Sequence, residues 1–292
     1  MSGRLDSIRF TKMQGVGNDF VVVDGRALRD LDWSGLAREI CDRRFGVGAD
    51  GLLVVDTSLR ADVAMRMFNP DGTPDVCGNG LRCVSRFVAD KDGLALPASL
   101  RIATLAGVRN ASVEQHDDGG TAVQVEMGEP RFAPGDIPMT VCGVDVRDYP
   151  ITVDGQEMRL DALSTGSTHA VVFVDALPDD EVFDHLSPLV ENHPLFPLRT
   201  SLMWAVVEDR HTVRLRIWER GVGETWGCGT GACAAVVAAR RRGLVDDEAR
   251  VTSRGGDLCV RWLGHGPIWK SGPAVYVFSG IYPLDPNGRD RR

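Results

Sequence analysis

The 292-residue chain has no apolar run that approaches the roughly 18 residues needed to span a membrane. Its first residues lack the apolar segment of a secretion signal, so we expect a cytoplasmic protein. Positive charge is scarce: 33 Lys and Arg stand against 41 Asp and Glu, a formal net charge of −8, and basic residues gather only at 240–242 and 289–292. We therefore expect neither a membrane nor a nucleic acid as a partner.

The chain also lacks the motifs that hold most cofactors. It has no C-x-x-C or H-E-x-x-H pattern for a metal, and none of its glycine-rich turns completes a P-loop or a G-x-G-x-x-G fingerprint. Only three lysines occur, Lys12, Lys91 and Lys270, and none stands in a context that suggests a pyridoxal-phosphate Schiff base. We expect no cofactor and no metal.

Cysteine is present in an odd number, seven, which in a chain of this length indicates free thiols rather than a disulfide framework. Two short ranges, Cys77–Gly80 and Cys228–Gly231, read Cys-Gly-Asn-Gly and Cys-Gly-Thr-Gly, and each leads into a segment predicted to be helical, 81–90 and 232–242. A thiol at a helix N-terminus faces unpaired N–H groups and the positive end of the dipole, which lower its pKa. The repeat predicts one such thiol from each half of a duplicated chain.

The rest of the chain alternates short strand-like segments with turn signals. Helical spacing of apolar residues predicts two further helices, over 34–43 and 179–189. The expected fold class is α/β of the α+β kind, with many short strands around one or two helices in each half. We expect a first domain over residues 1–119 with a returning C-terminal strand from 273–292, and a second domain over 120–272.

Five stretches carry a resemblance to a known family, and they follow one another over nearly the whole chain. They are Phe10–Phe20, Arg44–Gly51, Phe68–Gly72, Cys77–Gly80 and Trp218–Ala232. In these stretches the sequence resembles the diaminopimelate epimerases. The resemblance implies two pseudo-symmetric domains, each a strand-rich, barrel-like sheet around a central helix, with the active site in the interdomain cleft. It also implies a cofactor-independent isomerase, acting as a homodimer on a small amino-acid substrate, that converts LL-2,6-diaminopimelate to the meso form for lysine and peptidoglycan biosynthesis.

The chemistry of such a reaction agrees with a pair of cysteines. Inverting the α-carbon of an amino acid requires one group to remove its proton from one face and another to deliver a proton to the opposite face. We assign these roles to Cys77 and Cys228 as a thiolate/thiol pair. The helix N-termini would hold the α-carboxylate, on which negative charge develops.

The resemblance extends to the residues around the two cysteines. The α-carboxylate would be held, mostly through backbone N–H groups, by Gly78, Asn79, Gly229 and Thr230. The substrate amine would be contacted, and the thiols tuned, by Glu219 and His169. The pocket would be completed by Asn18, Asn69 and Arg220, with Arg220 the partner of the distal carboxylate.

Two positions depart from the family where the distal end of the substrate would bind: Ser167 and Ser201 stand where the family has asparagine. Serine retains a donor and an acceptor but loses the reach and the second donor of an amide. These departures leave open a racemase or epimerase of another amino acid on the same scaffold. A redox protein that joins Cys77 and Cys228 in a switchable disulfide is an alternative of another class.

Overall fold

The computed structural model describes residues 6–28, 30–115, 120–143 and 145–284, and it divides into two compact units. The first unit comprises Met1–Val125 with Pro273–Arg292, and the second comprises Glu126–Gly272. The predicted boundary between 119 and 120 lies beside residues 116–119, which are outside the described part. Residues 285–292 of the predicted returning strand are outside it as well.

In the first unit, eight strands follow one another in the sheet, each hydrogen-bonded to the next. In spatial order they are β18 (Val275–Pro283), β1 (Ser7–Gly15), β2 (Asn18–Asp24), β3 (Gly51–Asp56), β4 (Val63–Phe68), β6 (Ala98–Thr104), β7 (Gly107–Gln115) and β8 (Thr121–Gly128). The pairs β2–β3 and β4–β6 are parallel and the others antiparallel. The two-residue strand β5 (Pro74–Asp75) adds to β4.

The second unit repeats this order. Its strands are β9 (Val146–Val153), β10 (Gln156–Ser164), β11 (Thr168–Phe173), β12 (Ser201–Asp209), β13 (Thr212–Glu219), β15 (Glu248–Ser253), β16 (Gly256–Arg261) and β17 (Ile268–Pro273). The parallel pairs are now β11–β12 and β13–β15, and the short strand β14 (Gly223–Thr225) adds to β13 as β5 does to β4. The predicted fold class, with two similar sheet-rich units, is confirmed.

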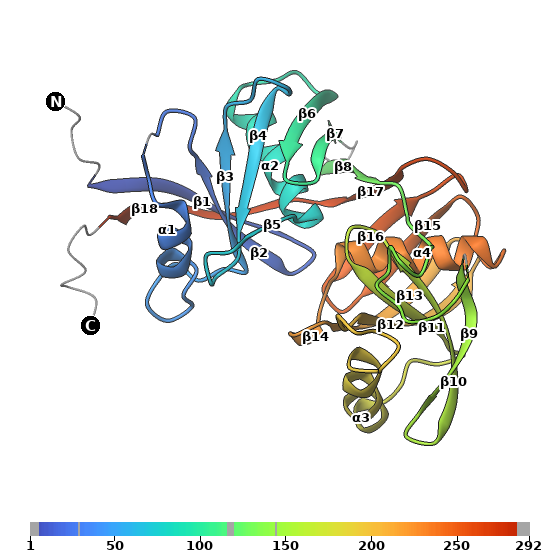
Figure 1. The fold of residues 1–292 in the computed structure, drawn as a ribbon. Coiled ribbons are helices and arrows are strands. Elements are labelled where there is room, and N and C mark those ends of the chain that lie inside the picture. The colour runs from blue at the N-terminus through green and yellow to red at the C-terminus, as the bar shows by residue number, and fades with distance from the viewer. Residues whose placement is uncertain (1–5, 29, 116–119, 144, 285–292) are drawn as a thin grey trace. The chain divides into compact units, whose positions relative to one another are not determined.

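The helices occupy matching places in the two units (Figure 1). The connections between the first parallel pairs contain α1 (Trp33–Ile40) and α3 (Asp180–Glu191). Those between the second pairs contain α2 (Gly78–Lys91) and α4 (Gly229–Arg241). Helix α2 contacts β1, β2, β3, β4, β6 and β7, and α4 contacts the equivalent six strands of its own unit. Both helices are therefore central, and most of their residues are buried.

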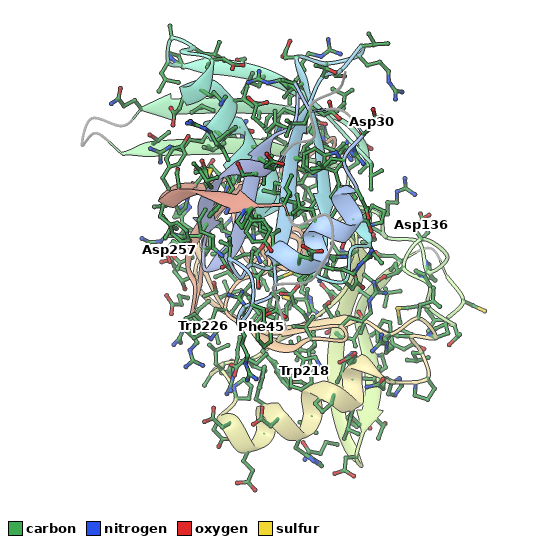
Figure 2. All side chains as sticks on the ribbon, turned by 90° about the vertical axis from the view of Figure 1, so that its left-hand side faces the viewer. Asp30, Phe45, Asp136, Trp218, Trp226 and Asp257 are labelled. Carbon is green, nitrogen blue, oxygen red and sulfur yellow. The ribbon has the colours of Figure 1, made fainter. Side chains whose placement is uncertain are left out.

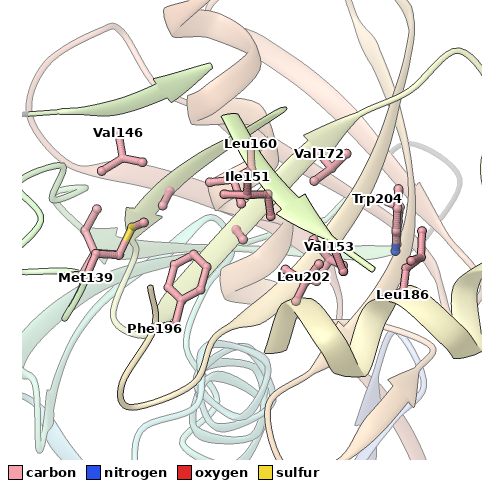
Figure 3. Close-up of a cluster of buried hydrophobic side chains, with 14 of the residues drawn as sticks. Met139, Val146, Ile151, Val153, Leu160, Val172, Leu186, Phe196, Leu202 and Trp204 are labelled. Carbon is pink, nitrogen blue, oxygen red and sulfur yellow. The ribbon is translucent and has the colours of Figure 1, made fainter. Parts of the chain in front are cut away.

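The outer helices complete the cores. In the second unit, a cluster of buried apolar side chains joins β9–β12 to α3 (Figure 3). Within this cluster the Trp204 indole also donates to Ser187 Oγ at 3.0 Å. Trp218, labelled in Figure 2, packs edge-on against Phe183 of α3, with ring centroids 5.8 Å apart. An equivalent cluster in the first unit gathers around α1.

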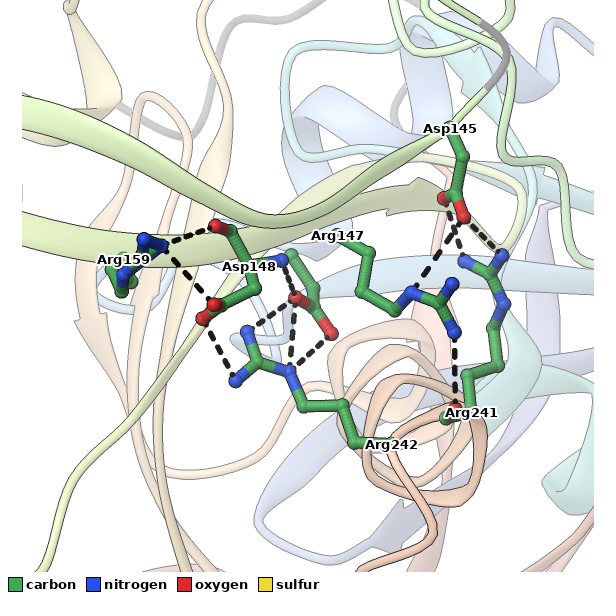
Figure 4. A network of polar contacts seen from close by, with 7 residues as sticks. Asp145, Arg147, Asp148, Arg159, Arg241 and Arg242 are labelled. Atoms are coloured by element: carbon green, nitrogen blue, oxygen red, sulfur yellow. Dashed lines mark hydrogen bonds and ion pairs between the residues drawn. The ribbon is translucent and has the colours of Figure 1, made fainter.

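A network of ion pairs holds the last turn of α4 (Figure 4). Arg241 makes two hydrogen bonds to Asp145, at 2.9 and 2.6 Å, and Arg242 Nε contacts both oxygens of Asp161 at 3.1 and 2.9 Å. Asp161 is 3 % exposed, and it also accepts a hydrogen bond from the Asp148 N–H at 2.6 Å. The basic last turn also complements the helix dipole, so the end of α4 away from Cys228 is anchored to β9 and β10.

None of the helices in the described ranges is both long and apolar enough to cross a membrane.

Candidate active site

In the first unit, Cys77 is the N-cap residue of α2. Its backbone is extended, with φ −143° and ψ 114°, and its Sγ accepts a hydrogen bond from the Gly80 N–H at 3.3 Å. The side-chain oxygen of Ser, Thr, Asp or Asn usually takes this place, and here a half-buried sulfur does. Residues Gly78–Gly80, predicted to precede the helix, form its first turn.

Glycine leaves room for a strand side chain at the third residue of each central helix. A Cβ on Gly80 would lie 2.8 Å from Leu53 Cδ2 of β3, and a Cβ on Gly231 of α4 would overlap the Met203 side chain of β12. Leu53 and Met203 are each the third residue of equivalent strands. Each unit thus packs its cysteine-bearing helix end closely on its own sheet.

Two asparagines lie against Cys77. Asn18, at the start of β2, accepts through Oδ1 from the Cys77 thiol at 3.8 Å and from Asn79 Nδ2 at 3.4 Å. Asn18 Nδ2 donates to Asp50 Oδ2 at 2.6 Å, and Asn79 Oδ1 accepts from Arg82 Nη1 at 3.0 Å. Cys77 therefore stands beside a continuous row of four polar side chains.

Two further residues of the first unit were predicted to belong to the site, Asn69 before Cys77 and Gly78 after it. Gly78 is the first residue of α2. Asn69 follows β4, and its Nδ2 donates to Thr73 Oγ1 at 3.2 Å and to Asp75 Oδ2 at 3.3 Å. These contacts engage the Asn69 amide within its own turn.

In the second unit, Cys228 caps α4 in the same way. Its φ and ψ are −122° and 109°, and its Sγ accepts from the Gly231 N–H at 3.4 Å. Gly229 and Thr230 form the start of the helix, and Thr230 Oγ1 lies 3.5 Å from the sulfur. Cys228 is only 6 % exposed, so this sulfur is better shielded from water than its counterpart.

The helix N-terminus does not control the ionisation of Cys228. Burial raises the pKa of this thiol well above its ordinary value, and the Glu219 carboxylate raises it further, whereas hydrogen bonds from Thr230 and Gly231 act in the opposite direction. The predicted lowering of the pKa is therefore wrong for this cysteine, because the loss of water from a thiolate outweighs the helix dipole. The neutral thiol is the favoured form of Cys228 here.

Glu219 ends β13 and is held by the neighbouring strand. Its Oε1 accepts from Thr225 Oγ1 of β14 at 2.6 Å, and β14 pairs with β13 across Glu219 and Gly223. The effect of Glu219 on the pKa of Cys228 includes a side-chain hydrogen bond to the thiol. The structure thus brings this predicted carboxylate and its thiol together.

His169 is completely buried on β11. Burial, and then the charge of Arg220, lower its pKa to about 3. Its Nε2 lies 2.9 Å from Ser167 Oγ, and Ser167 in turn donates to Thr230 Oγ1 at 3.3 Å. Within the described residues its Nδ1 has no hydrogen-bond partner. A neutral imidazole with its proton on Nε2 leaves only an acceptor unpaired, and a chain of hydrogen-bonding groups then runs from His169 to Cys228.

Ser201 and Arg220 are joined at the end of β13. Ser201, the first residue of β12, is buried, and its Oγ accepts from the Arg220 backbone N–H at 3.1 Å. The exposed Arg220 guanidinium donates to the Leu198 carbonyl at 3.1 Å. Ser201 therefore shapes the turn that carries Arg220.

Glu191 supports the same turn and was missed by sequence reasoning. This carboxylate ends α3, is 5 % exposed, and accepts from Trp218 Nε1 at 2.6 Å, the Gly221 N–H at 2.8 Å and Arg199 Nη1 at 3.1 Å. It thus ties α3 to both sides of the Glu219–Arg220 pair. An acidic residue at the end of an amphipathic helix gives no signal of such a role. Asp50 was also missed, although it lies within a stretch that carried the family resemblance.

Among the described residues, no three His, Cys, Asp or Glu side chains are grouped so that they could hold a metal ion.

Comparison with known proteins gives consistent matches over the chain. A family model described as "Diaminopimelate epimerase" matches residues 10–133 and 162–277. The diaminopimelate epimerase of Moorella thermoacetica is 43 % identical over 281 residues, covering 95 % of this chain and 100 % of that protein. The diaminopimelate epimerase of Laribacter hongkongensis is 46 % identical over 283 residues, covering 95 % and 99 %.

Solved structures extend the likeness of fold. A hydroxyproline epimerase from Agrobacterium vitis superposes with a TM-score of 0.68 at 19 % identity, covering 97 % of this chain and 94 % of that one. A probable proline racemase from Agrobacterium radiobacter K84 gives 0.70 at 18 % identity, with the same coverage. At such low identity these structures establish the fold alone.

Proposed function

Because this chain belongs to the diaminopimelate epimerase family, we propose that it interconverts LL-2,6-diaminopimelate and meso-2,6-diaminopimelate without a cofactor. The observation that carries the proposal is the pair of cysteine-capped helices, one in each of two units with the same strand order. The names of the relatives favour diaminopimelate over another amino acid as the substrate. The product would serve lysine and peptidoglycan biosynthesis.

The proposed mechanism uses the two thiols on one carbon. The thiolate of one cysteine removes the proton from the α-carbon, and the thiol of the other delivers a proton to the opposite face. The two exchange roles when the substrate enters with the other configuration. The reaction therefore requires that Cys77 and Cys228 reach the same α-carbon from opposite sides.

The backbone at the two helix ends is suited to the substrate's α-carboxylate. The backbone N–H groups at Gly78, Asn79, Gly229 and Thr230 belong to the first turns of α2 and α4, at the positive ends of the helix dipoles. Negative charge that develops next to this carboxylate in the transition state is stabilised by such donors and by the helix dipoles.

Glu219 couples substrate binding to the ionisation of Cys228. Its carboxylate raises the pKa of the thiol, and it is a natural partner for the substrate's ammonium group. When the ammonium neutralises that carboxylate, one cause of the raised pKa is removed, so the thiolate forms more readily with substrate bound. His169 acts through Ser167 and Thr230 rather than as a cation, since its pKa of about 3 keeps it neutral.

The distal end of the substrate would meet the residues that the family resemblance assigns to it. The Arg220 guanidinium would pair with the distal carboxylate, and Asn18 and Asn69 would complete the pocket with Ser167 and Ser201.

Two further properties complete the proposal. A cytoplasmic location would keep the thiols reduced, and all seven cysteines of the structure are free. A homodimer would cover the exposed apolar side chains of β18, where Val277, Phe278 and Ile281 are 54, 50 and 62 % exposed. Of these, Ile281 lines a hollow of about 870 Å³ to which β1 also contributes. Patches of this kind are uncommon on monomers.

The test of the activity is an assay under reducing conditions in deuterated water. We expect both stereoisomers of diaminopimelate to interconvert and to take up deuterium at the α-carbon, and other L-amino acids to remain unchanged. Turnover of another amino acid with none of diaminopimelate would refute the substrate. Absence of deuterium uptake from every amino acid would leave the redox alternative. For the homodimer, Ile281→Lys should change the mass in sedimentation from two chains to one, and an unchanged mass would place the interface elsewhere.

A further inference from the structure

The row of polar side chains beside Cys77 runs from Arg82 through Asn79 and Asn18 to Asp50. Each end of the row can take only one role in a hydrogen bond. At one end the Arg82 guanidinium can only donate hydrogen bonds, and at the other the Asp50 carboxylate can only accept them. Between them the amides of Asn79 and Asn18 are linked, with Nδ2 of Asn79 donating to Oδ1 of Asn18 at 3.4 Å.

These ends determine which way both amides face. If Asn79 turned over, its NH₂ group would meet the guanidinium of Arg82, and if Asn18 turned over, its oxygen would meet the carboxylate of Asp50. Either reversal places like groups together, which costs the desolvation of an unpaired polar group. The oxygen of Asn18 therefore faces Cys77 Sγ for chemical reasons, at the 3.8 Å of the structure.

Both ends are themselves held. Asp50 Oδ2 also accepts from the Asp19 N–H at 3.0 Å, and its Oδ1 accepts from Arg43 at 2.7 Å. Arg82 is fully buried, and its Nε donates to the Pro273 carbonyl at 3.2 Å. The row cannot reverse by a simple rotation of either end.

We propose that Asp50 is a positioning residue, which keeps the Asn18 oxygen turned toward Cys77 as an acceptor for its S–H and thereby favours the thiol over the thiolate. A thiol can donate to this oxygen, whereas a thiolate facing it would be repelled. For its catalytic meaning the inference rests on the proposed function, but the positioning itself can be measured without turnover.

Other groups near this half-site can also affect the titration of Cys77. Among the described residues, the charged and titratable side chains of this half-site include Lys12, Asp19, Arg43, Asp50, Asp75, Arg82 and Cys83. The test must separate the orientation of Asn18 from a change in their summed charge.

The measurement is the rate of alkylation of Cys77 by iodoacetamide as a function of pH, followed by mass spectrometry of the peptide that contains it. In Asp50→Ala, Asn18 loses its acceptor, and only the long bond from Asn79 Nδ2, at 3.4 Å, still opposes its turning. We expect the midpoint of the profile to fall by up to about 0.7 pH unit, the equivalent of one ordinary hydrogen bond. The exposed Cys142 provides an internal standard in every sample.

Two variants separate the causes. Asp50→Asn removes the charge but retains an oxygen that can accept from Asn18 Nδ2, so its profile should match that of the parent protein. Arg43→Gln removes the ion pair of Asp50 and leaves the bond to Asn18 intact, so it should match as well. If Asp50→Ala fails to fold, Asn18→Ala removes the acceptor directly and should lower the midpoint in the same way.

Three results would overturn the proposal: no change in Asp50→Ala, an equal change in Asp50→Asn, which would identify charge as the cause, or a parallel change at Cys142. None of these depends on the substrate. Failure of the parent enzyme to epimerise diaminopimelate would instead refute the proposed function and leave the alkylation result standing.

Discussion

The caps of α2 and α4 are built alike, with an extended cysteine, a glycine N–H on the sulfur, and a glycine pressed against the third residue of a strand. Beyond that first layer the two half-sites differ. Cys77 is half-buried beside amides whose direction is set by permanent charges, whereas Cys228 is buried beside hydroxyl groups, a neutral imidazole and a carboxylate.

This difference concerns how each sulfur responds to a change of its own protonation. A hydroxyl group rotates and can donate or accept, so the chain through Ser167 and Thr230 can follow Cys228 between thiol and thiolate. The row beside Cys77 has no such freedom. The two units share one fold, but the polar groups around Cys228 can reorient and those around Cys77 cannot.

Replacing either cysteine should produce the largest effect. In Cys77→Ala and in Cys228→Ala we expect kcat for diaminopimelate to fall by about 10⁴-fold, the upper range for loss of a general acid or base. Both variants should still fold, although each loses a helix cap, at a cost of about 1 kcal/mol, and Cys228→Ala also loses a buried sulfur. Cys142→Ala, at an exposed site, serves as the control and should retain full activity. Near-normal turnover in one of the two alanine variants would show that the half-sites are not partners in one reaction.

Glu219→Gln should produce the next largest effect, and it should change the ionisation of Cys228 without changing that of Cys77. Removing the carboxylate removes a cause of the raised pKa of Cys228, so the alkylation midpoint of Cys228 should fall while that of Cys77 stays constant. The substrate's ammonium loses a charged partner, and kcat/KM should fall about 10- to 100-fold. Glu224→Gln, a matched change in β14 at a residue that pairs with Arg216 and Arg254, should leave both quantities nearly unchanged. A shift at Cys77 equal to that at Cys228 would contradict the assignment.

Ser167→Ala tests the adaptable chain. It breaks the link between His169 and Thr230, and we expect kcat to fall about 5-fold, the equivalent of one hydrogen bond. Ser201→Ala removes the acceptor for the Arg220 N–H instead, so its effect should fall mainly on KM. Steady-state kinetics distinguishes the two, and identical changes in kcat and KM for both variants would remove the distinction.

The paired change to asparagine, Ser167→Asn with Ser201→Asn, should raise kcat/KM for diaminopimelate if the serines weaken the distal contacts.

The last prediction concerns stability against acid rather than turnover. The pKa of His169 is about 3 in the folded protein and about 6.5 when unfolded, so the unfolded chain takes up a proton first as the pH falls. The stability contributed by neutral His169 is therefore complete above pH 6.5 or so and is lost as the pH falls toward 3. In urea unfolding, the free energy of unfolding of His169→Gln should fall less between pH 7 and pH 5 than that of the parent protein. The exposed His185, paired with Asp154, provides the control in His185→Gln, and equal losses in all three proteins would refute the assignment.

Much of the fold follows from local patterns. The repeated cysteine motif, the spacing of apolar residues in α1 and α3, and the frequent turn signals predicted two sheet-rich halves with few helices. The starts of α2 and α4 were predicted three residues late. The motif placed each cysteine near a helix N-terminus, but glycine has low helix propensity and cysteine is not among the usual N-cap residues, so propensity did not start the helices directly after Cys77 and Cys228.

Less of the candidate active site could be predicted from sequence patterns. The motif and the family resemblance singled out the cysteines and most of their neighbours, but the contacts of Asn18 join residues 59 positions apart in the chain. Burial decides the pKa of Cys228, and burial is a property of packing rather than of the motif. Glu191 and Asp50 act through partners that only the folded chain brings to them.

The glycine N–H groups on the two sulfurs have one further consequence. A thiolate is a stronger acceptor than a thiol, so ionisation of Cys77 should displace the amide proton resonance of Gly80, and ionisation of Cys228 that of Gly231. Each reactive sulfur thus carries its own spectroscopic reporter on the main chain. The charge of the two half-sites could be followed separately during a titration with substrate, with both cysteines intact and without a chemical label.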